Sequence, residues 1–210
     1  MNKKGILVVV SGFAGSGKGT LMKKLMTDYD DYALSVSATT RLPRPGEVDG
    51  REYFFKTVEE FKKMIAEEEF IEYAQYVSNY YGTPKKYVKE QLNEGKDVIL
   101  EIEIQGALQI KEKFPEALLL FVTPPSAEIL KNRLIGRGTE EASVIQKRLE
   151  RAREEAEGIE KYDYFVINDE LDRCALQMHQ IIQSEHDRTF RNKEFINQIR
   201  RELESFSKGE

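Results

Sequence analysis

The chain of 210 residues is 40% apolar, which is enough to bury the core of one folded domain, or of one domain with inserts. It contains no run of about 18 apolar residues, so we expect no helix that spans a membrane. The formal net charge of −5 argues against general attraction to nucleic acid, and an anionic ligand must therefore meet a local cluster of cations. The single cysteine, Cys174, excludes an internal disulfide framework and is typical of a cytoplasmic protein.

Five short apolar runs in the chain predict buried strands. In chain order they are Ile6–Val10, Leu34–Ser37, Val98–Ile102, Leu118–Val122 and Tyr164–Ile167. Segments with helical periodicity lie between or after these runs, at Leu21–Met26, Gln105–Phe114, Ala127–Leu134, Glu141–Glu157 and Leu171–Ile182. Strands that alternate with helices predict an α/β fold with a parallel five-stranded sheet and helices on both faces.

The stretch from about 39 to 94 interrupts this alternation, because it is too long for a single crossover. It has strand-like pieces of its own at Glu52–Phe55, Phe70–Tyr73 and Tyr80–Gly82. The capping box of Thr57 and Glu60 opens a helix within it, and a second helix is expected with Pro84 at its first position. We expect an inserted subdomain here.

The rest of the chain divides into a core, a flap and a tail. The core segments 1–38 and 95–185 are expected to form, with the insert, one domain over 1–185. Two glycines flank Arg137 in the sequence and predict a movable flap at about 133–151.

The tail, residues 186–210, is predicted to contain an amphipathic helix. Its apolar residues recur at helical spacing, at Phe195, Ile196, Ile199, Leu203 and Phe206. We expect this apolar stripe to dock on the same chain. A contact with a second subunit, in a homo-oligomer, is the alternative.

A glycine-rich segment follows the first predicted strand and opens the first predicted helix. It reads Ser11-Gly12-Phe13-Ala14-Gly15-Ser16-Gly17-Lys18-Gly19-Thr20, which is typical of a loop that binds the phosphates of a nucleoside triphosphate. The glycines let backbone N–H groups turn toward an anion, and Lys18 can reach the β- and γ-phosphates. The strict pattern has a hydroxyl directly after the lysine, but here Gly19 stands there and Thr20 supplies the hydroxyl. Either Thr20 or water is therefore expected at Mg²⁺.

Two arginines lie in a loop that prolines stiffen. Arg41 and Arg44 are three residues apart, with Pro43 and Pro45 beside Arg44, and they predict a preorganised fork for a phosphate. Tyr53 can add a hydroxyl donor. The alternative interpretation is a solvated basic loop.

Several motifs resemble those of guanylate kinases and occur in the same order. They are Thr39-Thr40-Arg41-Leu42-Pro43-Arg44-Pro45-Gly46-Glu47, Gly50-Arg51-Glu52-Tyr53-Phe54-Phe55, Glu69-Phe70-Ile71-Glu72-Tyr73-Ala74, Asn79-Tyr80-Tyr81-Gly82-Thr83, Leu100-Glu101-Ile102-Glu103-Ile104-Gln105-Gly106, Arg133-Leu134 before Arg137-Gly138-Thr139, Lys147-Arg148-Leu149 and Val166-Ile167-Asn168-Asp169. Together they cover about residues 5 to 184. The resemblance implies the fold of a P-loop nucleoside monophosphate kinase, with a GMP-binding insert and a mobile flap.

The resemblance extends to the residues that read the base. Glu72 is similar to the family's guanine-binding carboxylate, and Glu103 to a further acidic position near the exocyclic amine. The chemistry agrees, because two carboxylate oxygens suit the adjacent N1–H and N2–H₂ donors of guanine, which adenine lacks. Ser37 and Thr83 hydroxyls can donate to the acceptor edge. The alternatives are that Ser37 is a plain strand-end hydroxyl, that Glu72 is a solvated strand residue, that Tyr81 is a packing residue and that Thr83 caps the following helix.

The resemblance also implies which side chains handle phosphate. Those similar to the family's holders of the GMP phosphate are Arg41, Arg44, Tyr53 and Tyr81. Arg137 and Arg148 resemble flap arginines that neutralise the phosphoryl group in transit, and Arg133 is expected to assist. Arg151 is expected to pair with a nearby glutamate instead. Asn168, at the end of the last strand, is expected to contact adenine.

Two glutamates end an apolar strand. The spacing of two puts Glu101 and Glu103 on one face, and ligands of parallel sheets bind beyond the carboxyl ends of the strands. Glu101 is expected to orient Mg²⁺ through water. Many guanylate kinases have aspartates at these positions, and a hydrated strand end is the alternative.

The implied reaction is MgATP + GMP ⇌ ADP + GDP, with dGMP left open as a second acceptor. In-line phosphoryl transfer rests on alignment and charge neutralisation, for which Lys18, Arg44, Arg137 and Arg148 are the expected catalytic residues. Two rival hypotheses are a guanylate-kinase-like module that binds without catalysis and a related P-loop kinase with another phosphorylated acceptor. We expect no nucleic-acid or membrane partner.

Overall fold

The computed structural model describes residues 4–76, 78–136 and 142–207. Its main sheet has five parallel strands in the order β2-β7-β1-β8-β9. These strands are β1 (Leu7–Gly12), β2 (Tyr32–Leu34), β7 (Asp97–Glu101), β8 (Leu118–Thr123) and β9 (Tyr164–Ile167). The predicted α/β architecture with a parallel five-stranded sheet is confirmed.

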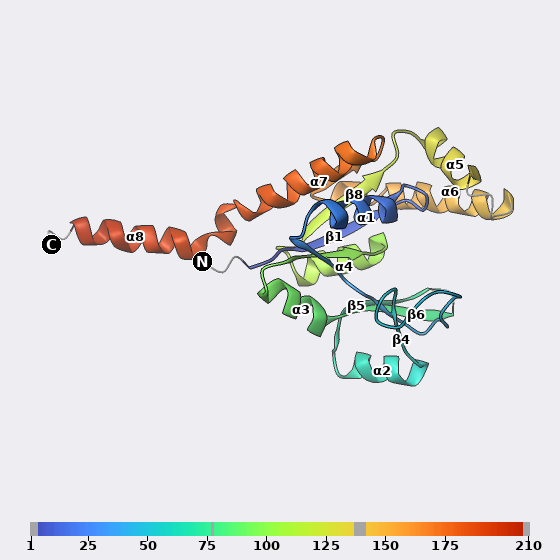
Figure 1. Ribbon diagram of the computed structural model, residues 1–210, viewed down its shortest axis with the longest axis horizontal. Coiled ribbons are helices and arrows are strands. Elements are labelled where there is room, and N and C mark those ends of the chain that lie inside the picture. Colours follow the sequence, from blue (N-terminus) through green and yellow to red (C-terminus); the bar gives the residue numbers. More distant parts are fainter. Residues whose placement is uncertain (1–3, 77, 137–141, 208–210) are drawn as a thin grey trace.

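Helices cover both faces of this sheet (Figure 1). One face carries α1 (Lys18–Asp28) and α7 (Leu171–His186), and the other carries α3 (Lys85–Asn93) and α4 (Ile104–Lys113). Side chains along β1 alternate between them: Val8 and Val10 join the first core, and Leu7 and Val9 join the second. Because both faces are buried at the centre of the sheet, the middle residues of β1, β7 and β8 are apolar.

One predicted strand was misplaced. The run Leu34–Ser37 shares only Leu34 with β2, because Tyr32 and Ala33 are the buried residues of that strand. After the N–H of Ser35 donates to the carbonyl of Ile99 over 2.8 Å, the chain leaves the main sheet. It then enters a second sheet.

The second sheet has four strands in the order β4-β3-β6-β5. They are β3 (Ala38–Thr39), β4 (Phe54–Phe55), β5 (Phe70–Tyr76) and β6 (Asn79–Pro84). Helix α2 (Val58–Ala66) begins at the predicted capping box, and its Phe61 is buried against Ala38 and Phe70. Pro84 is the N-cap of α3 rather than its first helical residue, so that prediction was off by one position.

Two helices flank the predicted flap. Helix α5 (Ala127–Gly136) ends within the predicted bounds of about 133–151, and α6 (Ala142–Ala156) begins within them and continues beyond, while residues 137–141 lie outside the described part. A short 3-10 helix, η1 (Ile159–Lys161), leads back to β9. Leu130, Leu134 and Ala152 of these helices pack against Phe13 and Phe121, which joins this region to the core.

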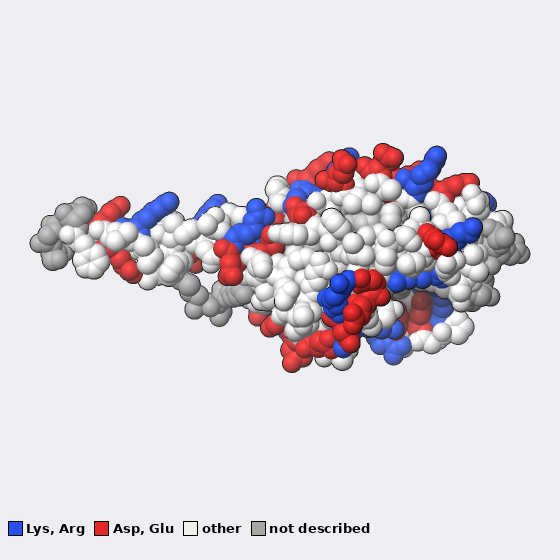
Figure 2. Space-filling view, turned by 90° about the horizontal axis from the view of Figure 1, so that it is seen from above, with Lys and Arg blue, Asp and Glu red and all other residues white. Residues whose placement is uncertain are grey.

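The tail contains the predicted helix, but its docking on the same chain was a wrong expectation. After the 3-10 helix η2 (Thr189–Arg191), α8 (Lys193–Ser207) extends away from the body in both views (Figures 1 and 2). Four members of its apolar stripe are between 38% and 77% exposed: Phe195, Ile199, Leu203 and Phe206. Helical spacing predicts a stripe but not the surface that covers it.

The described residues contain no helix long and apolar enough to cross a membrane. On the face that Figure 2 presents, acidic and basic side chains are mixed rather than gathered into regions of one sign.

Candidate active site

The glycine-rich segment forms a tight loop between β1 and α1. Gly15 and Gly17 have φ values of 88° and 90°, a region that disfavours residues with a Cβ. A Cβ on Gly17 would lie 2.4 Å from Nδ2 of Asn168, so glycine is also needed for space there. Gly17 is the N-cap of α1, which therefore points its N-terminus into the loop.

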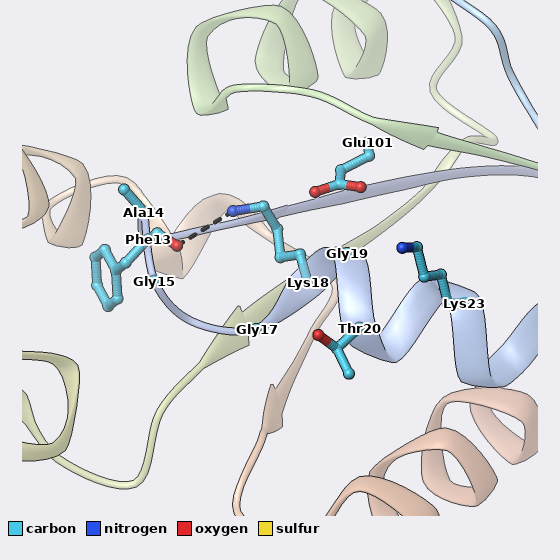
Figure 3. A pocket seen from close by; sticks show the side chains of 9 residues that line it. All are labelled: Phe13, Ala14, Gly15, Gly17, Lys18, Gly19, Thr20, Lys23 and Glu101. Atoms are coloured by element: carbon cyan, nitrogen blue, oxygen red, sulfur yellow. Dashed lines mark hydrogen bonds between the residues drawn. The ribbon is translucent and has the colours of Figure 1, made fainter. Parts of the chain in front are cut away.

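Lys18 lies across this loop (Figure 3). Its Nζ donates to the carbonyls of Gly12, over 2.5 Å, and Phe13, over 3.2 Å. A pocket of about 400 Å³ opens beside it, and Thr20 and Glu101 are among its lining residues. The remaining lining residues are Phe13, Ala14, Gly15, Gly17, Gly19 and Lys23.

Two side chains, which we call the brace, hold the phosphate loop through its backbone, and the sequence did not reveal this contact. Asn168 is buried and donates from Nδ2 to the carbonyl of Ser16 over 2.8 Å. Arg133 donates to the same carbonyl over 3.1 Å and to the carbonyl of Asn168 over 2.8 Å. Both side chains therefore position the loop backbone, whereas the sequence suggested contacts with the nucleotide itself. The order of the motifs was the only signal that could have linked them.

A second pocket, of about 520 Å³, adjoins the first, since Lys18 and Glu101 line both. The predicted acceptor residues that line it are Ser37, Tyr53, Glu72, Tyr81 and Glu103. Residues of β5 and β6, the end of β7 and the segments just before β3 and β4 thus meet in one cavity. Arg41, Arg44 and Thr83 are not among its lining residues.

Glu72 is buried at the floor of the second pocket, with 6% of its surface exposed. The Thr83 hydroxyl donates to its Oε1 over 2.7 Å. Burial raises the pKa of the Glu72 carboxyl, and the hydrogen bond from Thr83 opposes that rise. A solvated Glu72 is excluded by this burial, and a helix-capping Thr83 is wrong because Pro84 is the N-cap.

The two loop arginines are held by Glu47, which the sequence analysis did not single out. Glu47 Oε1 accepts from Nη2 of Arg41 over 2.9 Å, and Oε2 accepts from the backbone N–H of Arg44 over 2.7 Å. These bonds lower the pKa of the Glu47 carboxyl. The guanidinium of Arg41 also lies 5.3 Å from the ring centre of Tyr53. The side chain of Arg44 is exposed. The spacing of Glu47, three after Arg44, was the available signal.

The two strand-end glutamates have different surroundings. Burial at the junction of the pockets raises the pKa of the Glu101 carboxyl, although water reaches the side chain, and the charge of Lys18 opposes the rise. Glu103 lies 3.5 Å from Nη2 of Arg151. Arg151 also pairs with Glu155 over 2.9 Å, so its predicted pairing with a nearby glutamate is confirmed.

The whole region has the sequence and fold of a known family. Residues 4–185 match the family model described as guanylate kinase. The chain is 52% identical over 202 residues to a guanylate kinase from Caldanaerobacter subterraneus, with 96% of this chain and 98% of the relative covered. It is 51% identical over 191 residues to one from Lactococcus lactis, with 91% and 93% covered.

The chain belongs to the guanylate kinase family. A solved structure agrees: the crystal structure of guanylate kinase from Anaplasma phagocytophilum has a TM-score of 0.73 and 32% identity, with 90% of each chain covered. The resemblance that the motifs indicated is therefore confirmed.

The structure describes two of the three flap arginines that the resemblance implied. Arg133 ends in the brace under the loop, and Arg148 lies half-buried on α6. Arg137 lies outside the described residues.

Proposed function

We propose that this member of the guanylate kinase family transfers the terminal phosphoryl group of MgATP to GMP, with ADP and GDP as products. The observation that carries the proposal is that two pockets of different character share Lys18 and Glu101. One is a phosphate loop at a helix N-terminus, and the other encloses a buried carboxylate. Reacting groups bound in the two would meet at their junction.

The donor side has the groups that a triphosphate needs. Backbone N–H groups of residues 12–20 and the N-terminus of α1 favour an anion, and Lys18 adds a full charge. The brace of Arg133 and Asn168 keeps this backbone in place before the ligand arrives. Asn168 is thus proposed to act on ATP binding through the loop, and its contact with adenine stays a prediction.

Mg²⁺ fits the oxygen donors of this side. The hydroxyl of Thr20 and the carboxylate of Glu101 line the same pocket, and Mg²⁺ prefers such hard oxygen ligands together with water and phosphate. Within the described residues, no group of three His, Cys, Asp or Glu forms a protein-only metal site. We therefore propose that the ion is held mainly with the nucleotide, whose charge it neutralises when bound.

The acceptor side suits guanine. Glu72, oriented by Thr83, presents a carboxylate to the N1–H and N2–H₂ donors of the base, and Ser37 and Glu103 lie in the same pocket. Adenine would give the buried carboxylate no such donors and leave it with only the Thr83 hydroxyl, and each hydrogen bond missing at a buried group costs about 1–3 kcal/mol or more. We propose that the GMP phosphate is held by Arg41, Arg44, Tyr53 and Tyr81.

Transfer needs the two sides to approach each other and exclude water. We propose that the insert, about 39–94, and the flap, about 133–151, close over the core segments 1–38 and 95–185 of the 1–185 domain. Arg148, and Arg137 beyond the described residues, would then neutralise the group in transit together with Lys18.

Release of ADP from MgATP, with GMP, dGMP, AMP, UMP and CMP offered separately, tests the proposal. Turnover with GMP, with or without dGMP, is the expected result. Turnover with another acceptor alone would favour a related P-loop kinase. Tight MgATP binding with no turnover would favour a non-catalytic guanylate-kinase-like module.

Contact with a second subunit is the prediction that remains for the apolar stripe of α8. Ultracentrifugation of the full chain, beside a chain that ends at residue 192, tests it: only the full chain should self-associate. A cytoplasmic location also stays a prediction.

A further inference from the structure

A second lysine of α1 borders the phosphate-loop pocket. Lys23 lines this pocket together with Lys18, Thr20 and Glu101. It follows Thr20 by three residues and Gly19 by four, so it rises from the helix face that the first turn presents to the pocket. Figure 3 shows its side chain extending from α1 on the side where Glu101 lies.

The neighbouring lysine differs in its partners. Nζ of Lys24 lies 3.1 Å from Oδ1 of Asp28 and 3.0 Å from Oδ1 of Asp172. The ammonium of Lys23, by contrast, makes no hydrogen bond or ion pair with any residue of the described ranges. Two adjacent lysines on one helix therefore have different roles: one ties α1 to α7, and the other is available to a ligand.

The charge of the pocket indicates which ligand this is. MgATP remains an anion, and apart from Lys18 and Lys23 the lining residues carry no positive charge, whereas Glu101 adds a negative one. A second ammonium would offset the part of the negative charge on the phosphate chain that Lys18 does not neutralise. Lys23 lines the donor pocket but not the pocket that contains Glu72, which assigns it to the donor nucleotide.

The position of Lys23 relative to Glu101 indicates which phosphate of the donor nucleotide it contacts. Glu101 lines both pockets, so it marks the junction that the terminal phosphate must face in order to be transferred. Lys23 lies on this side of α1. We propose that Lys23 binds the terminal phosphate of the donor nucleotide, as a second ammonium beside Lys18. The inference rests on the proposed function, because it takes a nucleoside triphosphate as the ligand of the loop.

Calorimetric titration of the full chain with a non-hydrolysable ATP analogue and with ADP, each with Mg²⁺, tests this role. Lys23→Met is expected to weaken binding of the analogue about fivefold, as an exposed ion pair would, and to change ADP binding by less than about twofold. Lys23→Arg keeps the charge and should retain affinity for the analogue within about twofold. Because Lys23 is exposed, both variants should fold, which their melting curves check.

Lys24→Met is the matched control, since it removes the adjacent lysine whose ammonium is held by Asp28 and Asp172. It should bind both nucleotides as the wild type does. Equal losses for the analogue and ADP in Lys23→Met, or no loss for either, would overturn the assignment to the terminal phosphate. Failure of the wild-type chain to bind either nucleotide would instead overturn the proposed function, on which the inference rests.

Discussion

The donor and acceptor sides of the site hold their polar groups in different ways. On the donor side the contacts go to the backbone: Arg133 and Asn168 both donate to the carbonyl of Ser16. On the acceptor side one side chain holds another, as Thr83 holds Glu72 and Glu47 holds Arg41. A loop fixed through its backbone presents N–H groups that suit any triphosphate. A pocket of paired side chains, in contrast, can select one base.

This difference predicts where specificity is lost. A change on the donor side should affect every acceptor equally, because the phosphate loop serves all of them. A change on the acceptor side should affect GMP use and leave the binding of ATP almost intact.

Replacement of Lys18 should have the largest effect. Lys18→Met is expected to lower kcat/KM about 10³-fold with every acceptor that the wild type accepts, because the charge that stabilises the transferring phosphoryl group is removed. Release of ADP measures this, with Lys62→Met on the exposed face of α2 as a control. Full recovery of turnover at saturating ATP would show that Lys18 serves binding alone.

Arg44→Ala, on the acceptor side, should have the second largest effect. We expect a loss of about 100-fold in kcat/KM for GMP and little change in ATP affinity, because a charged contact to the acceptor phosphate is lost. Arg51→Ala is the control in the same loop, since the Arg51 guanidinium contacts Glu52 and the carbonyl of Gly46. Unchanged GMP kinetics would remove Arg44 from the site.

Glu72→Gln should lower kcat/KM for GMP by about 30-fold, because Gln offers only one acceptor atom to the two guanine donors. The fold should persist, since Thr83 can still donate to the amide oxygen. Glu69→Gln, at an exposed carboxyl next to β5, should behave as the wild type. Equal activity of Glu72→Gln with GMP would contradict the proposed base contact.

The pH dependence of GMP binding gives a further test of the acceptor side. Because burial raises the pKa of Glu72, this carboxyl is protonated at a higher pH than an exposed one, and GMP affinity should fall as pH decreases toward the ordinary pKa of a carboxyl. The fall should be steeper in the wild type than in Glu72→Gln, which controls for titration of GMP itself. Parallel profiles would argue against an ionised Glu72 in the complex.

The same rise in the pKa of Glu72 also affects the stability of the fold. Unlike GMP affinity, the contribution of this group to stability increases as pH decreases. Between the ordinary and the raised pKa of Glu72, the folded state binds more protons than the unfolded state. The contribution of Glu72 to the free energy of unfolding is therefore largest below its ordinary pKa. It is lost as pH rises through the raised value. Denaturant unfolding at neutral pH should therefore show Glu72→Gln to be no less stable than the wild type.

Gly106→Ala should have the smallest effect. A Cβ there would lie 3.2 Å from Oε2 of Glu72 and 3.4 Å from Cδ1 of Ile102, so the carboxylate must shift by a few tenths of an ångström. We expect KM for GMP to rise about threefold while alanine stabilises α4 by up to about 1 kcal/mol. Steady-state kinetics and a melting curve check both. Unchanged KM would show that Glu72 has room to adjust.

Much of the donor side could be predicted because it is local. The glycines, Lys18 and the helix that follows are contiguous, and the positive φ values at Gly15 and Gly17 match the expected loop. The brace was missed, because Asn168 meets Ser16 across 152 residues of chain. No periodicity or short motif carries a contact of that range.

The acceptor side was predicted from ordered motifs and corrected in its details. The hydroxyl of Thr83 holds Glu72, a contact that the motifs did not indicate, and its predicted contact with the base stays a prediction. The run Leu34–Ser37 was expected in the main sheet, but the chain leaves that sheet after Leu34. In both cases the sequence showed which residues matter and not which neighbour each would meet.

By itself, the sequence determined the elements: apolar runs that must be buried on both faces, a glycine-rich turn before a helix, and an amphipathic tail. These follow from the spacing of residues along the chain, which sets local conformation and the direction of each side chain. Only the tertiary structure decided that Lys18 and Glu101 join two pockets and that the apolar stripe of α8 stands clear of the body. Contacts between distant segments depend on the packing of whole elements, and residue spacing within one segment does not specify that packing.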